Sequence, residues 1–281
     1  MESFCVATVS KLQVCMSKLA HKQKDMGPEN DGYNMKVGNA IDIGIEIHYA
    51  TNEEAVTAFE MAVYTAVISH YAAGNSVFTI PQLCKVLCLS NKNCFTKNLQ
   101  EAVLDALRKM MRIHVCIKAK AQSAKYKDLK PMYLNLLLHW REIVCQSDNG
   151  RSCKCIEVLE TPLLFEYSKS IKQFVSVPFE KIGTSKRLNN TIPTIAVRYA
   201  LLRRVLIMKR NKSNNRIALS SLAKECRNEC SDMEKLRKIL RSVLDCWKES
   251  GFIEGYSEYK EYRTIKGFVI FLEEETKNRR K

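Results

Sequence analysis

The chain has 281 residues, of which 46% are hydrophobic, and 45 lysines and arginines stand against 30 acidic residues. This composition excludes a largely disordered chain, and the length is typical of one large or two ordinary domains. Residues 1–180 hold 21 basic and 18 acidic residues, a net +3, whereas residues 181–281 hold 24 and 12, a net +12. Such a concentration of positive charge favours a polyanionic partner, with nucleic acid first; surface charge that serves only solubility is the alternative.

The twelve cysteines fit neither a disulfide framework nor a zinc site. Residues 1–20 lack the sustained apolar segment of a secretory leader, so we expect a reducing, cytoplasmic location. No CxxC pair occurs, and the close pairs are Cys84/Cys88, Cys153/Cys155 and Cys226/Cys230. We therefore expect apolar core cysteines, no metal and no cofactor. No apolar run approaches the roughly 18 residues of a membrane span, so no membrane partner is expected.

Residues 1–38 are expected to form a partly flexible N-terminal arm. The prediction places a short helix at about 5–24 and a loop rich in turn-forming residues at 26–34. Apolar residues then alternate with polar ones between 41 and 49, which predicts a strand with one buried face.

Three helices and two strands are predicted next. Apolar residues recur at three- and four-residue spacing at about 52–73, 79–89 and 96–112, with Thr79 and Thr96 as N-caps of the last two. The β-like stretches at 113–121 and 132–139 follow, joined by the basic loop SAKYKDLK. Three helices followed by a hairpin, or wing, are typical of a winged helix.

A second copy of this pattern follows a connecting stretch at 156–180, in which we expect a short helix at 165–170 and a strand at 174–177. Helices are predicted from 191 to about 209, at 220–227 and at 231–248, before a tyrosine-rich hairpin sequence from Phe252 onward. The predicted fold is α+β, mostly α, with two tandem winged-helix domains. The arm covers 1–38, the first domain with its connecting segment 39–180, and the second domain 181–281.

The helix predicted at 231–248 has one apolar and one cationic face. A capping box of Ser231 and Glu234 is expected to begin it, and Gly251 to end it. At about 100° per residue, one stripe collects the apolar side chains and the opposite side the basic ones. The apolar stripe is Leu236, Leu240, Val243, Leu244 and Trp247; the cationic side is Arg237, Lys238, Arg241 and Lys248.

The third helix of this module type enters the major groove and reads base edges, while the wing contacts the backbone or the minor groove. The strongest candidates for DNA contact are therefore Arg237, Lys238 and Arg241, with Lys248 on the same face. Lys97, Gln100 and Arg108 are weaker candidates in the first module, and Lys260, Arg263 and Lys266 are expected to neutralise phosphate. The alternative for each is a charged residue that merely faces solvent.

Enzyme activities are not indicated. A GxxxxGK[ST] phosphate loop is absent, and the five histidines lie singly along the chain rather than as the metal-binding pair of a nickase. Acidic pairs such as Glu53/Glu54 look like solvated residues rather than a two-metal nuclease site. We therefore expect a binding protein without catalytic residues.

Three segments resemble a known family. They are AFEMAVYTAVISHYAAGNSVFTIPQLCKVL at 58–87, LETPLLFEYSKSIKQFVSVPFEKI at 159–182 and RYALLRRVLIMK at 198–209. In this order they resemble the theta-type replication initiator proteins of low-GC Gram-positive plasmids and integrated elements, which have tandem winged helices. Of these segments, the turn from Gly74 to Thr79 and the Ser-Val-Pro motif at 176–178 are the most specific to the family.

The resemblance implies a protein that binds repeated double-stranded DNA sites at a replication origin and recruits host replication proteins without hydrolysing nucleotide. The third helices at 96–112 and 231–248 would be the DNA readers, and the strand at 174–177 would join the modules. Some relatives also repress their own promoter as dimers, so a homodimer is possible. Two other functions stay open: a winged-helix transcriptional repressor, and a protein-interaction scaffold that does not bind DNA.

Overall fold

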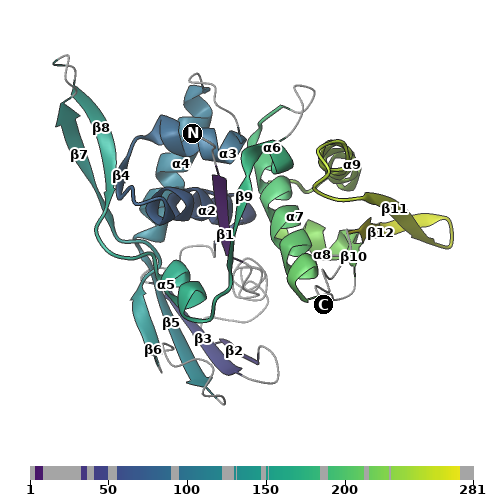
Figure 1. The fold of residues 1–281 in the computed structure, drawn as a ribbon, viewed down its shortest axis with the longest axis horizontal. Helices are drawn as coiled ribbons and strands as arrows, with labels where there is room; N and C mark the ends of the chain where they lie inside the picture. Colours follow the sequence, from purple (N-terminus) through teal and green to yellow (C-terminus); the bar gives the residue numbers. More distant parts are fainter. Residues whose placement is uncertain are drawn as a thin grey trace, which may run out of the picture.

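A computed structural model describes residues 4–8, 33–36, 41–49, 56–89, 95–121, 130, 132–146, 150, 152–183, 189–211, 215–227 and 229–272. Helices and antiparallel sheets are mixed throughout, in agreement with the α+β prediction (Figure 1). In chain order the elements are β1 (Phe4–Thr8), β2 (Tyr33–Lys36), β3 (Ile41–Tyr49), α2 (Ala58–Ala72), β4 (Val77–Phe78), α3 (Ile80–Cys88), α4 (Lys97–Met110), β5 (Ile113–Ala121), β6 (Met132–Leu136), β7 (Trp140–Gln146), β8 (Ser152–Val158), α5 (Leu163–Ser170), β9 (Phe174–Pro178), α6 (Phe179–Ile182), α7 (Ile192–Asn211), β10 (Arg216–Ala218), α8 (Leu219–Glu225), α9 (Met233–Glu249), β11 (Gly255–Glu261) and β12 (Thr264–Phe271).

Two groups of elements repeat one order: helix, short strand, helix, helix, strand, strand. The first module is α2, β4, α3, α4, β7 and β8, and the second module is α7, β10, α8, α9, β11 and β12. In each, the short strand pairs with the last strand, giving the sheet orders β4-β8-β7 and β10-β12-β11. The hairpins β7–β8 and β11–β12 project at opposite ends of the molecule (Figure 1).

The hairpin of the first module is not the one expected from the sequence. Strands β5 and β6 do pair with each other, but they join β2 and β3 in a separate sheet of order β2-β3-β5-β6. The strand that pairs with β4 is β8, through Val77 with Glu157 and Phe78 with Ile156. The stretches at 113–121 and 132–139 are therefore an insertion between α4 and β7. Most of the basic loop between them lies outside the described residues.

The start of the chain also differs from the prediction. Residues 4–8 form a strand, not the first turn of a helix, because they pair antiparallel with β9 from Phe4 opposite Pro178 to Thr8 opposite Phe174. The rest of the helix predicted at 5–24 lies outside the described residues. Strand β9, which was predicted at 174–177, runs between the two modules (Figure 1), as the family resemblance implied.

Helices α2 and α7 lie at the centre and pack on each other. Thr57 begins α2 with a capping box, in which its hydroxyl accepts from the N–H of Glu60 and the Glu60 carboxylate accepts from the N–H of Thr57. Every residue from Met61 to Ser69 is buried, because α3, α4, α7 and β1 surround the helix. The buried apolar side chains of both modules form one continuous cluster.

Polar contacts also join the modules. The α3 helix ends at Leu89, whose φ is +48°, and its last carbonyls point toward α7. The buried Arg198 guanidinium donates to the carbonyl of Leu87, and the Tyr199 hydroxyl donates to the carbonyl of Val86 at 2.6 Å. A cation at a helix C-terminus meets the negative end of the helix dipole, so these contacts fix α3 against α7.

Most described cysteines are core residues, as expected from the sequence. Cys5, Cys84, Cys88, Cys226 and Cys230 are buried. Burial raises the pKa of the Cys84 thiol to about 12 and of the Cys5 thiol to about 11, so both stay protonated and behave as small apolar groups.

Candidate nucleic-acid interface

The α9 helix has well-defined ends. Asp232 caps its start, because its carboxylate accepts from the N–H groups of Glu234 and Lys235 at 2.8 and 3.3 Å. The predicted capping box of Ser231 and Glu234 is therefore wrong by one residue. Gly251 follows the last turn with φ +69°, a conformation that favours glycine, and ends the helix as predicted.

The apolar stripe of α9 faces the core, so its basic side faces outward. The buried residues are Leu236, Ile239, Leu240, Val243, Leu244 and Trp247, which include the whole predicted stripe. Lys238 and Lys248 are exposed, while Arg237 and Arg241 are half-buried. All four predicted basic residues of this helix therefore reach its solvent side.

Two of these cations are held by carboxylates. Arg237 forms an ion pair with Glu234 one turn earlier. Arg241 reaches the neighbouring hairpin, where its Nε donates to Glu258 at 2.7 Å. This hydrogen bond raises the pKa of Arg241 and lowers the pKa of Glu258, so the pair stays charged. Among the residues that the structure describes, neither Lys238 nor Lys248 pairs with a carboxylate.

A second contact ties α9 to the hairpin. The Tyr256 hydroxyl of β11 donates to Asp245 of α9 at 2.6 Å. With Arg241 and Glu258, this bond fixes the hairpin beside the cationic face of the helix. Helix and hairpin therefore present one surface.

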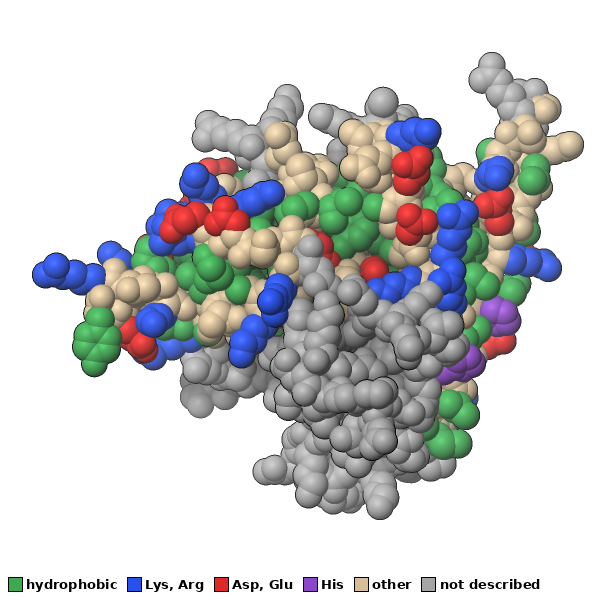
Figure 2. Space-filling model, turned by 180° about the vertical axis from the view of Figure 1, so that it is seen from behind, with side chains coloured by type: hydrophobic (Ala, Val, Ile, Leu, Met, Phe, Trp, Pro, Cys, Tyr) green, Lys and Arg blue, Asp and Glu red, His purple; other side chains and the backbone are tan. Residues whose placement is uncertain are grey.

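The three cations predicted on the hairpin are all exposed. They are Lys260, Arg263 and Lys266, and no carboxylate of the described chain forms an ion pair with any of them. Lys and Arg side chains are prominent at this end of the molecule (Figure 2). An unpaired exposed cation can approach phosphate without first leaving a carboxylate.

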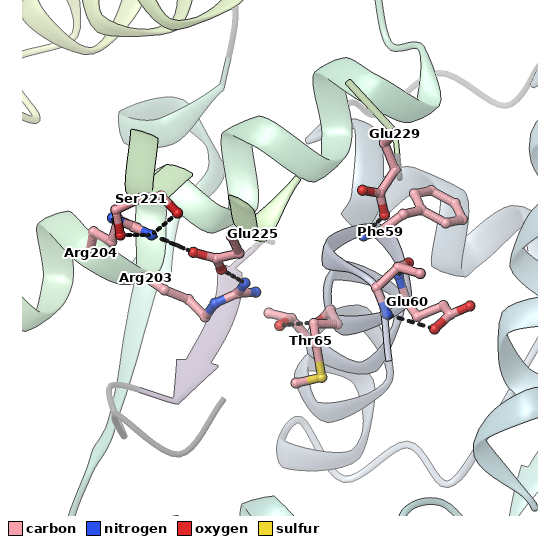
Figure 3. A network of polar contacts seen from close by, with 10 residues as sticks. Phe59, Glu60, Thr65, Arg203, Arg204, Ser221, Glu225 and Glu229 are labelled. Atoms are coloured by element: carbon pink, nitrogen blue, oxygen red, sulfur yellow. Dashed lines mark hydrogen bonds and ion pairs between the residues drawn. The ribbon is translucent and has the colours of Figure 1, made fainter. Parts of the chain in front are cut away.

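A buried network of ion pairs fixes the helix that packs against α9. Glu225 at the end of α8 accepts from Arg203 at 2.6 Å and from Arg204 at 2.7 Å, and Arg204 also donates to Ser221 (Figure 3). Burial works to raise the pKa of Glu225, but the two guanidinium groups outweigh it and lower the pKa. The network locks α8 to α7, and α8 in turn packs against α9.

Glu229, between α8 and α9, reaches the other module. Its Oε1 accepts from the N–H of Phe59 in the first turn of α2 at 2.8 Å (Figure 3). Trp247 of α9 donates from Nε1 to the carbonyl of Ile182 at 3.0 Å. Trp247 thus fixes α9 to α6, and Glu229 fixes the segment that precedes α9 to α2.

The corresponding helix of the first module, α4, starts as predicted. Thr96 caps it by accepting from the N–H of Leu99 at 3.3 Å. Its buried residues, Leu99, Val103, Ala106, Leu107 and Met110, lie on one side of the helix, in agreement with the apolar spacing predicted for 96–112.

The candidate DNA-contacting residues of α4 interact with residues three to five positions away in the chain. Lys97 lies 3.6 Å from Glu101, and Arg108 lies 3.2 Å from Asp105. Gln100 donates to the carbonyl of Phe95 at 3.1 Å. The structure therefore brings a carboxylate next to each of the two cations.

The β7–β8 hairpin beside α4 is also neutralised. Arg141 pairs with Glu157 at 2.6 Å and Lys154 pairs with Glu142 at 2.9 Å. Sequence reasoning did not consider this hairpin, because it assigned the wing to 113–139.

Sequence reasoning also missed three exposed cations of the second module: Lys224 and Arg227 around the end of α8, and Lys235 in the first turn of α9. Lys235 lies two residues before Arg237, the first residue of the predicted cationic side. Lys224 and Arg227 could have been found by also considering the second helix of the module, α8, which comes before α9 in the chain and packs against it.

The described part of the chain gives no sign of two other kinds of site. Within it, no three His, Cys, Asp or Glu side chains are grouped so that they could hold a metal ion. None of its helices is both long and apolar enough to cross a membrane.

Comparisons with known proteins give distant structural likenesses. No protein-family model and no curated protein matches the sequence. A crystal structure of domains 2 and 3 of RctB has a TM-score of 0.43 and 12% identity, over 92% of this chain and 97% of that chain. A second RctB domain 2-3 structure has a TM-score of 0.42 and 11% identity, over 88% and 93% of the two chains. These values assign neither a family nor a function.

Proposed function

We propose that this protein is a sequence-specific double-stranded DNA-binding replication initiator of a plasmid or mobile element, built from two winged helices and acting without catalytic residues. The order of elements in each module and the pairing of the short strand with the last strand support the winged-helix assignment. The initiator role extends the resemblance of the segments at 58–87, 159–182 and 198–209. Origin repeats and host replication proteins are the partners that this role requires, and a homodimer would accompany repression of its own promoter.

One observation carries the DNA-binding part of the proposal. The outward side of α9 and the adjoining hairpin present exposed cations that have no ion-pair partner among the described residues: Lys235, Lys238, Lys248, Lys260, Arg263 and Lys266. A helix with a cationic outer face beside a projecting cationic hairpin fits a duplex, with the helix in the major groove and the hairpin on the flanking backbone.

The binding test uses the full chain and two DNA probes. Overlapping duplexes from the DNA next to its own coding region are compared with a random duplex of equal length, by fluorescence anisotropy at increasing salt. We expect affinity to fall steeply with salt on both probes, and one or more of the native duplexes to bind at least about a thousandfold more tightly. A chain that bound no duplex at low salt would contradict the proposal and favour the protein-interaction scaffold.

The initiator role needs a second measurement. A plasmid that lacks its own initiator but carries the bound duplex should replicate only when the protein is supplied. If the duplex is bound but the plasmid is not copied, the protein is a transcriptional repressor rather than an initiator.

A further inference from the structure

The tip of the β11–β12 hairpin combines an unusual backbone with an unusual surface. Glu261 and Thr264 are paired, so Tyr262 and Arg263 alone form the turn. Both have positive φ, +48° for Tyr262 and +67° for Arg263. A two-residue turn of this kind strongly prefers Asn-Gly, because side chains with bulk are strained in the left-handed region.

Within the described part of the chain, no packing or ion-pair contact of these two side chains offsets the strain. The Tyr262 side chain is fully exposed, at 101% relative accessibility, and Arg263 is also exposed. Neither side chain packs on the core or forms an ion pair within the residues described. A strained turn that displays a tyrosine and an arginine to solvent is the kind of outlier that marks a contact with a partner.

The part of the hairpin just below its tip is held by close contacts. Tyr259 lies opposite Gly267, and a Cβ on Gly267 would fall 2.6 Å from the Tyr259 ring and 2.1 Å from the carbonyl oxygen of Ile217. The Arg216 guanidinium lies 5.7 Å from the centre of the same ring. The three strands are therefore packed closely just below the tip, and the bonds to α9 fix the hairpin's direction.

We infer that Tyr262 and Arg263 form a minor-groove contact, in which Arg263 enters the groove and the Tyr262 ring packs against its sugar and base wall. This inference rests on the proposed DNA-binding function. The minor groove, about 6 Å wide, admits a narrow two-residue turn and attracts arginine by its negative potential. Lys260 and Lys266 on the same hairpin are placed for the flanking phosphates.

The test compares two duplexes that differ only in the minor groove. Alternating inosine–cytosine DNA lacks the 2-amino group that guanine–cytosine DNA places there, while the major-groove edges are the same. The wild-type chain should bind the inosine duplex more tightly in anisotropy titrations at fixed salt.

The decisive variant replaces the turn by its preferred sequence, Tyr262→Asn with Arg263→Gly. It should bind the inosine duplex about tenfold more weakly and lose the preference between duplexes. Its melting temperature should equal or exceed that of the wild type, because the strain is removed. The matched control, Lys260→Gln, removes one cation from the same hairpin; it should weaken both duplexes equally and keep the preference.

The outcomes separate this inference from the proposed function. If the wild type binds neither duplex, the DNA-binding function itself fails. If it binds both and the Asn-Gly variant binds as the wild type does, the minor-groove contact is wrong while DNA binding stands. A lower melting temperature of the variant would show that Tyr262 and Arg263 serve the fold instead.

Discussion

The two modules place the same elements next to each other but give their outer faces different charges. Every lysine and arginine of α4, β7 and β8 lies within 4 Å of a carboxylate: Lys97, Arg108, Lys109, Arg141 and Lys154. On α9 and the β11–β12 hairpin only Arg237 and Arg241 are paired in this way among the described residues. The same arrangement of elements therefore has a surface of paired charges in the first module and a cationic surface in the second.

Under the proposed DNA-binding function, this difference predicts which module contributes more of the affinity for DNA. An exposed ion pair is itself weak, about 0–1 kcal/mol, so pairing alone does not remove a cation from use. The adjacent carboxylate also repels phosphate, however, and this repulsion remains when the pair opens. We therefore expect the second module to supply most of the phosphate contacts. The first module should add few such contacts and mainly help to position the protein on the duplex.

The largest expected effect comes from removing the buried support of the cationic module. Glu225→Ala leaves Arg203 buried and Arg204 mostly buried without their carboxylate, which should cost about 3–5 kcal/mol of unfolding free energy. The matched change in the first module is Glu60→Ala, which leaves only Lys109. Urea denaturation followed by circular dichroism measures both. Equal losses would mean that the Glu225 network gives the second module no special support.

Charge reversal compares the two surfaces directly. Lys238→Glu with Lys260→Glu alters the second module, and Lys97→Glu with Arg108→Glu alters the first. Because lost phosphate contacts and new repulsion act together, the first pair should weaken duplex binding about a hundredfold and the second pair less than about fivefold. Anisotropy titrations give both values, and the salt dependence should flatten only for the Lys238/Lys260 variant. A larger loss from the α4 variant would reverse the assignment of the main surface.

A smaller effect distinguishes two roles of Arg241: contact with a base edge of DNA, or support of the hairpin through Glu258. If its guanidinium contacts a guanine edge, Arg241→Ala should weaken specific binding about five- to a hundredfold and relax the preference at one base pair. Glu258→Gln is the control, because it loosens the bond to the hairpin but keeps the arginine. Measurements on duplexes with single base changes decide between the two. If both variants lose the same affinity without a change in base preference, Arg241 supports the hairpin and does not contact a base.

The elements that the sequence predicted well are those with local signals. Helix α9 has a clean apolar stripe, and Gly251 supplies its stop, so its cationic face followed from spacing alone. The ion pairs on α4 lie three and four residues apart and could have been anticipated from the same spacing. The cap at Asp232 was missed by one residue, because Ser231 is an equally suitable capping residue.

Long-range strand pairing was the part that could not be predicted. Strand β5 directly follows α4 in the chain, as a wing strand would, and nothing local shows that it also pairs with β3 or that β4 pairs with β8 instead. Strand β1 has too few residues to show alternation, and its partner β9 lies about 170 residues away. The bond from Arg241 to Glu258 likewise depends on the packing of the hairpin against α9.

The smallest expected effect tests the two modules through pH. Glu225 has a lowered pKa in the folded protein, so its stabilising contribution is present above the unfolded value of about 4.3 and is lost as pH falls through the folded pKa. Burial outweighs the Lys109 pair and raises the pKa of Glu60, so its contribution is present at acid pH and is lost as pH rises through the folded pKa. Relative to wild type, Glu225→Gln should therefore be least stable near neutral pH, whereas Glu60→Gln should improve as pH rises. Urea midpoints of both variants from pH 3 to 7 measure these slopes, and slopes of the same sign would contradict the contrast between the two carboxylates.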